Sequence, residues 1–83
     1  MKTQLKSGFE VSTAMEVNEN IELVHQYVIW WHTNNRNSIY LMQSDFIYLS
    51  SESAMTAGLQ KIEELCTQSI QEINFIRNEK ETK

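Results

Sequence analysis

The chain has 83 residues, a formal net charge of −4, no proline and two glycines. This length allows one domain with a thin core, and so few turn-forming residues disfavour an all-β sandwich. Between Glu10 and Glu72 the only basic side chains are Arg36 and Lys61, which disfavours duplex DNA as a partner because DNA binding depends on neutralising phosphates.

The sequence also bears on the compartment. No apolar run approaches the roughly 18–20 residues of a membrane span, and the polar start of the chain does not resemble a signal peptide. Cys66 is the single cysteine and cannot form an intramolecular disulfide, which suits a reducing compartment. We therefore expect a cytoplasmic protein that does not enter a membrane.

The first part of the chain is expected to be a flexible arm over residues 1–12. Phe9–Val11 alternates apolar and polar residues but is too short to predict a strand. The sequence Thr13–Glu16 matches a capping box, and Asn18 is a second candidate for a helix N-cap. These signals predict a single helical domain over residues 13–78, followed by a C-terminal tail at residues 79–83.

The middle of the chain carries two sets of apolar residues at helical spacing. They are Ile21, Val24, Val28 and Trp31, and then Ile39, Met42, Phe46 and Leu49. If the polar run Thr33–Asn37 is a loop, the fold is a small three-helix bundle. If the helix continues from Glu19 to Leu49, the fold is an antiparallel helical hairpin, which we favour. Such a hairpin leaves a second apolar stripe uncovered and should form homo-oligomers.

A third interpretation of the same residues uses strands. Tyr27–Trp31 and Ile39–Met42 are rich in residues that favour β-structure, and Asn34–Asn37 is suited to a hairpin turn. The helical spacing persists through both segments, so the all-α fold remains the prediction.

The last segment, Ser51–Asn78, has the most regular spacing. Its seam consists of Met55, Leu59, Ile62, Cys66, Ser69, Ile73 and Ile76. Alternating steps of four and three residues are typical of a helix that packs on another helix. Ser50–Ser53 supplies a break and an N-cap. Gly58 lies inside this predicted helix, either because another backbone approaches closely or because a glycine is tolerated there.

No catalytic or metal-binding pattern is present. His25 and His32 lie two helical turns apart in the predicted helix, roughly 10 Å along its axis, too far to share one ion. Cys66 on the apolar seam is expected to be inert, and the adjacent Glu63 and Glu64 point in different directions on a helix. We therefore predict no enzyme activity, no cofactor and no metal.

An aromatic group around the single central arginine is the candidate interaction site. It consists of Tyr27, Trp30, Trp31, Arg36 and Tyr40. Rings and an arginine at the contact between protomers are suited to hold a planar base and a phosphate. Packing of the rings with one solvated arginine is the simpler interpretation.

Two resemblances follow from short segments. Phe9–Val11 and Ala54–Leu65 resemble parts of a set of short uncharacterised bacterial helical proteins, which implies no activity. Gln60–Leu65 resembles a segment of the phage helical-hairpin family that sequesters cyclic oligonucleotide signals of bacterial immunity. That resemblance implies a helical hairpin hexamer without catalysis, although Cys66–Gln68 stands where the family carries a tryptophan.

These observations predict a non-enzymatic interaction protein. We expect it to act as a regulator or inhibitor by binding a partner protein, as a homo-oligomer, with an acidic surface suited to a basic partner. The alternative is a phage-type protein that binds a small nucleotide, a cyclic oligonucleotide signal, between protomers.

Overall fold

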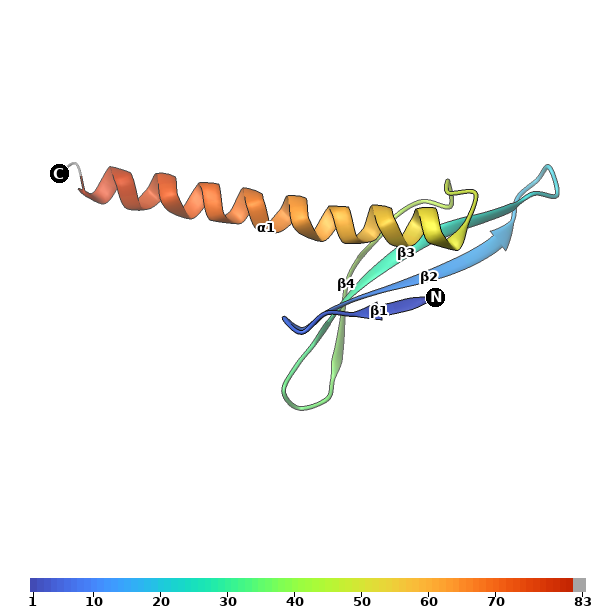
Figure 1. Ribbon diagram of the computed structural model, residues 1–83, viewed down its shortest axis with the longest axis horizontal. Helices are drawn as coiled ribbons and strands as arrows, with labels where there is room; N and C mark the ends of the chain where they lie inside the picture. The colour runs from blue at the N-terminus through green and yellow to red at the C-terminus, as the bar shows by residue number, and fades with distance from the viewer. Residues whose placement is uncertain (82–83) are drawn as a thin grey trace.

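The computed structural model describes residues 1–81 and shows an α+β fold (Figure 1). Its elements are β1 (Lys2–Gln4), β2 (Phe9–Val17), β3 (Leu23–His32), β4 (Ser38–Gln43) and α1 (Ser51–Glu81). The predicted all-α class is therefore wrong, and so are the helical hairpin and the three-helix bundle. Only the last of the predicted helices forms.

The four strands make one antiparallel sheet in the order β1-β2-β3-β4. Neighbours in the chain are neighbours in the sheet, so only short turns are needed to connect them. Val11 sits between Thr3 and Ile29 in the register, and a bulge between Ile29 and Trp30 interrupts the pairing of β3 with β4.

The helix prediction failed in β3 because this strand is apolar on both faces. Val24, Tyr27, Val28 and Ile29 are all buried. A continuous apolar run matches the spacing of a helix and the spacing of a strand equally well. Spacing alone therefore cannot distinguish a helix from a strand in this segment. The high content of valine, isoleucine and aromatic residues favours the strand. The alternative of strands at Tyr27–Trp31 and Ile39–Met42 was correct.

The supposed helix starts have other roles. The capping-box sequence Thr13–Glu16 lies inside β2. The side chain of Asn18 accepts hydrogen bonds from the backbone amides of Asn20 and Glu22, which closes the β2–β3 turn. The polar run after Trp31 forms the β3–β4 turn, in which the amide of Arg36 donates to the carbonyl of Thr33.

The first turns of α1 cover one face of the sheet. Met55 and Ile62 join Val11, Tyr27 and Ile29 in the buried core. The helix begins as predicted, because the Ser50 hydroxyl accepts a hydrogen bond from the backbone amide of Ser53 at 3.1 Å. This part of the sequence prediction is confirmed.

Both ends of the chain differ from their predicted form. The expected arm, residues 1–12, contains β1 and the start of β2. The backbone amide of Thr13 donates to the carbonyl of Met1, which ties β1 to its neighbour. The predicted tail at residues 79–83 begins inside α1, which extends to Glu81, and residues 82–83 lie outside the described part.

Sheet and helix overlap over only part of their lengths. With 31 residues, α1 is about 46 Å long, whereas its sheet-facing contacts end near Ile62. The structure is accordingly elongated, at 60 × 31 × 17 Å. The β2–β3 hairpin extends past the start of the helix at one end, and the outer half of α1 extends past the sheet at the other (Figure 1).

Candidate interaction surfaces

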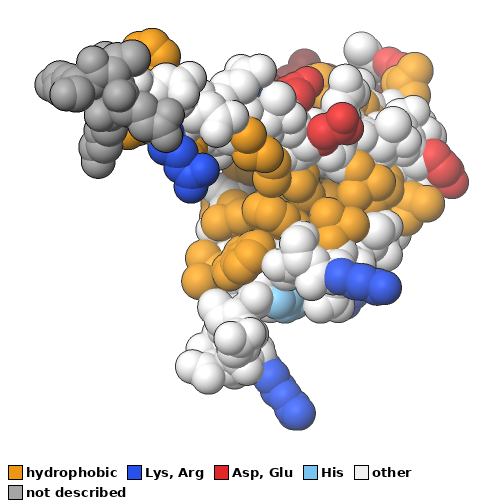
Figure 2. Space-filling view, turned by 60° about the vertical axis from the view of Figure 1, so that its left-hand side comes forward, with side chains coloured by type: hydrophobic (Ala, Val, Ile, Leu, Met, Phe, Trp, Pro, Cys, Tyr) orange, Lys and Arg blue, Asp and Glu red, His pale blue; other side chains and the backbone are white. Residues whose placement is uncertain are grey.

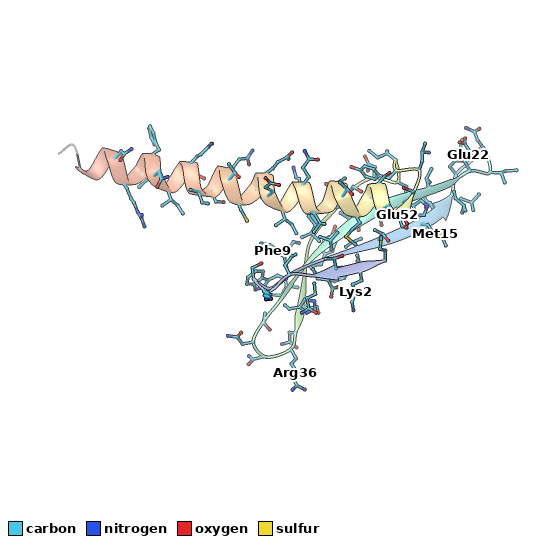
Figure 3. All side chains as sticks on the ribbon, viewed as in Figure 1. Lys2, Phe9, Met15, Glu22, Arg36 and Glu52 are labelled. Atoms are coloured by element: carbon cyan, nitrogen blue, oxygen red, sulfur yellow. The ribbon has the colours of Figure 1, made fainter. Side chains whose placement is uncertain are left out.

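The structure distributes the five predicted site residues over three places. Tyr27 and Trp31 alternate with Ile29 on the face of the sheet that α1 covers. Trp30 and Tyr40 pair on the opposite face. Arg36 is exposed in the β3–β4 turn, and Figure 3 places it at the tip of that turn.

Each ring already has a neighbour within the subunit. The rings of Trp31 and Phe9 meet edge to face at 4.9 Å, and those of Tyr27 and Tyr48 lie 6.0 Å apart. The packing interpretation therefore accounts for these contacts.

On the other face of the sheet, Trp30 Nε1 donates to Ser12 Oγ at 3.1 Å, and the Trp30 and Tyr40 rings meet edge to face at 5.8 Å. The three ring pairs and the hydrogen bond from Trp30 to Ser12 involve no arginine. Within one subunit, the five predicted residues are therefore not gathered at one place.

A hydrogen-bonded chain that the sequence did not reveal crosses the face opposite α1. Glu10 Oε1 lies 2.9 Å from His32 Nε2, and Ser38 Oγ lies 3.1 Å from His32 Nδ1. The acid, imidazole and hydroxyl follow one another as in a hydrolase triad. However, the open hollow of about 410 Å³ beside His32 is lined by Gln4, Leu5, Lys6 and Gly8, without Ser38. The chain links β2, β3 and β4 and holds the buried Glu10 carboxylate.

The other candidate chemistry is not assembled in residues 1–81. No group of three histidine, cysteine or acidic side chains in this part is placed to hold a metal ion. Cys66 is exposed on α1 rather than buried on a packed seam. In the same part of the chain, no helix combines the length and the apolarity that crossing a membrane requires.

The outer half of α1 presents an apolar stripe, which we call the outer helix surface. It consists of Leu65, Cys66, Ile70, Ile73 and Ile76, with Ser69 between them. Ile62 is only 6% exposed under the sheet, whereas Ile70 is 59% exposed. The stripe continues the face that packs on the sheet, since all of these residues lie within about 80° of Ile62 around the helix.

Apolar side chains continue from the helix onto the sheet. Figure 2 shows hydrophobic side chains gathered beneath the helix and over the adjoining sheet. Phe9, Trp31 and Ile39 share the helix-facing side of the sheet by register, and Ile39 is exposed. The outer helix surface thus ends against an apolar edge of its own subunit.

A second apolar surface lies at the opposite end, and we call it the hairpin-tip surface. It consists of Met15, Val17, Ile21 and Leu23, all of them exposed. Met15, Val17 and Leu23 share the helix-facing side of the sheet, beyond the first turn of α1. Acidic residues accompany them, and Figure 3 places Glu22 and Glu52 at the same end as Met15.

The sequence contained signals for both surfaces. The spacing of Ile73 and Ile76 predicts packing on another helix, whereas both side chains are exposed in the subunit. The spacing of Ile21 and Val24 predicts a helix, whereas Ile21 lies in the β2–β3 turn. The Asn18–Glu22 segment, with two asparagines between apolar runs, was the available turn signal.

Comparisons with protein-family models, with curated proteins and with solved structures find no match for this chain.

Proposed function

We propose that this chain is a non-enzymatic cytoplasmic interaction protein that regulates or inhibits a partner protein by binding it. The observation that carries the proposal is the hairpin-tip surface, where four large apolar side chains are exposed on the β2–β3 hairpin. Contiguous apolar patches on small proteins commonly mark sites of protein interaction. The partner is expected to present an apolar surface with a basic rim.

Ile21 is the strongest single feature of this surface. It is 87% exposed and has a φ of 60°. The left-handed conformation is rare for a β-branched residue and costs on the order of 1–3 kcal/mol. Asparagine or glycine suits such a turn better. An isoleucine held outward there weakens the free protein but gives a partner an apolar contact.

Charge supports the same partner chemistry. Glu16, Glu19 and Glu22 lie on or beside the hairpin, and Glu52 begins α1. Acidic side chains around an apolar centre favour a partner with lysine or arginine at its rim. Binding at such a rim should weaken as salt increases, because exposed charges are screened within about 10 Å at 0.1 M salt.

The test compares Ile21→Asn with Phe75→Asn. Asparagine at position 21 relieves the backbone strain, so the variant should be more stable by about 1 kcal/mol. It should nevertheless lose most of the partner captured from native cells by the tagged wild-type chain. Phe75 is equally apolar and lies on a distant face of α1, so Phe75→Asn should retain that partner. Equal capture by Ile21→Asn and wild type would contradict the proposal.

A further inference from the structure

The outer half of α1 extends past the sheet (Figure 1). Every side chain from Glu63 to Asn78 is exposed. Helices shorter than about 12–15 residues are marginal in water, and helices in proteins are stabilised mainly by packing of an apolar face. This half carries such a face, at Ile70, Ile73 and Ile76, and all three side chains remain exposed.

The spacing of the apolar residues on this face indicates which kind of element packs on it. Cys66, Ser69, Ile73 and Ile76 follow one another at steps of three and four residues. This is the spacing of a helix that packs lengthwise on another helix. In residues 1–81 the chain has one helix, α1 itself, so a second copy can supply the complementary helix.

The sheet determines the direction of the two helices. It lies on the same side of α1 as the outer helix surface, against Met55 and Ile62. In a parallel pair, both sheets would occupy the space between the helices. Because α1 extends past the sheet at one end (Figure 1), an antiparallel pair places each sheet beyond the end of the other helix, and only the outer halves overlap.

Charge and shape agree with one antiparallel register. When Cys66 packs opposite Ile76 of the second copy, Ser69 packs opposite Ile73, as alternating seam positions require. The same register brings Glu63 beside Arg77 of the second copy, and Ile70 beside its own equivalent. On one flank of the seam an opposite-charge pair therefore forms twice, with an apolar pair between. On the other flank Glu72 lies beside its own equivalent, and this one like-charge contact is outnumbered by the two opposite-charge pairs.

We infer that α1 of a second copy covers the outer helix surface, antiparallel, in a two-fold symmetric dimer. Such an interface uses the same patch on both subunits and closes without leaving a free patch. Each helix tip then points toward the Phe9, Trp31 and Ile39 edge of the other sheet. This inference rests on the proposed function, in which the chain acts by binding. It concerns the outer helix surface, whereas the proposed function concerns the hairpin-tip surface.

A membrane surface fits the same stripe less well. Helices that lie on membranes carry lysine and arginine beside their apolar face, which attracts anionic lipids. Here Lys61 and Arg77 are outnumbered by Glu63, Glu64 and Glu72. Vesicles containing phosphatidylserine are therefore expected to leave the protein unbound.

Sedimentation equilibrium tests whether a second copy covers the outer helix surface. The full-length wild type is compared with two single variants, Ile73→Glu and Phe75→Glu. Ile73 lies on the seam and Phe75 on the opposite side of the helix, and both are exposed. We expect a dimer for the wild type and Phe75→Glu, and a monomer for Ile73→Glu. A wild-type monomer, equal effects of the two substitutions, or binding of the wild type to the vesicles would overturn the inference.

The direction is tested by charge reversal. Glu63→Arg should raise the dimer dissociation constant by roughly tenfold, because it places two like charges beside each other at both ends of the interface. Adding Arg77→Glu should restore most of the affinity. A parallel pair would instead depend on Glu72, so sensitivity to Glu72→Arg with indifference to Glu63→Arg would overturn the antiparallel arrangement. Partner capture through Ile21 can be measured whether or not the dimer forms. The dimer and the proposed function can therefore fail independently.

Discussion

Gly58 of α1 lies directly against Val11 of β2. A Cβ atom at position 58 would come within 2.6 Å of Val11 Cγ1 and 3.0 Å of Tyr27 Cβ. The close neighbours of Gly58 are therefore side chains of the sheet, and not the second backbone that the sequence suggested. The contact sets how closely α1 packs on the sheet.

Gly58→Ala should therefore destabilise the protein. Alanine is favoured over glycine in a helix by about 1 kcal/mol, but the added methyl group must displace Val11 or Tyr27, which typically costs about 1–3 kcal/mol or more. We expect a lower urea midpoint for Gly58→Ala. Gln60→Ala, at an exposed position of the same helix, should change the midpoint little. A more stable Gly58→Ala protein would contradict the packing described.

Tyr27 should make the fold sensitive to alkaline pH. Burial raises the pKa of Tyr27 above its ordinary value of 10.0, and nearby Tyr48 and Glu64 raise it further. Between pH 10 and the raised pKa, the unfolded chain loses the phenolic proton while the folded chain retains it. Stability from this group is therefore present below pH 10 and falls as pH rises through that window.

The measurement is the unfolding free energy between pH 8 and 11, for the wild type and for Tyr27→Phe. Tyr27→Phe should show a shallower decline, because phenylalanine has no proton to lose. Absorbance titration at 295 nm should show a late ionisation in the wild type that is absent from Tyr27→Phe. An identical decline in both proteins would contradict this assignment.

The Glu10–His32 contact should stabilise the sheet. Glu10 is buried, and His32 Nε2 lies 2.9 Å from its carboxylate, while Lys2 Nζ is 3.7 Å away and largely exposed. His32→Ala removes the closer partner and leaves a buried carboxylate poorly satisfied, at a cost of about 1–3 kcal/mol. His32→Gln retains a donor and should lose less. Thermal melts at pH 7 would measure both, and equal stability of His32→Ala and wild type would contradict the structural role.

The helix and the sheet differ in how well the sequence predicted them. The start of α1 followed from Ser50, and its buried face followed from Met55 and Ile62, because only one side of the helix is apolar. In β3, Val24 and Val28 are buried on one face while Tyr27 and Ile29 are buried on the other. That arrangement removes the alternation from which strands are recognised.

The candidate site was predictable only in part. The aromatic residues are visible in the sequence, but their separation onto two faces depends on the strand register. Trp30 and Trp31 are adjacent in sequence and point to opposite sides of β3. The outer helix surface was visible in the spacing of Ile73 and Ile76, whereas its exposure depends on the sheet ending near Ile62.

The most direct test of the account is oxidation of an Ile76→Cys variant that retains Cys66. Within one helix these positions lie about 15 Å apart, beyond the reach of a disulfide. In the antiparallel dimer, Cys66 of one copy packs opposite position 76 of the other. The account predicts a covalent dimer that forms much faster than with the wild type or with Phe75→Cys. Cross-linking of Ile76→Cys at the rate of these controls, or efficient cross-linking of the wild type through Cys66 alone, would contradict it.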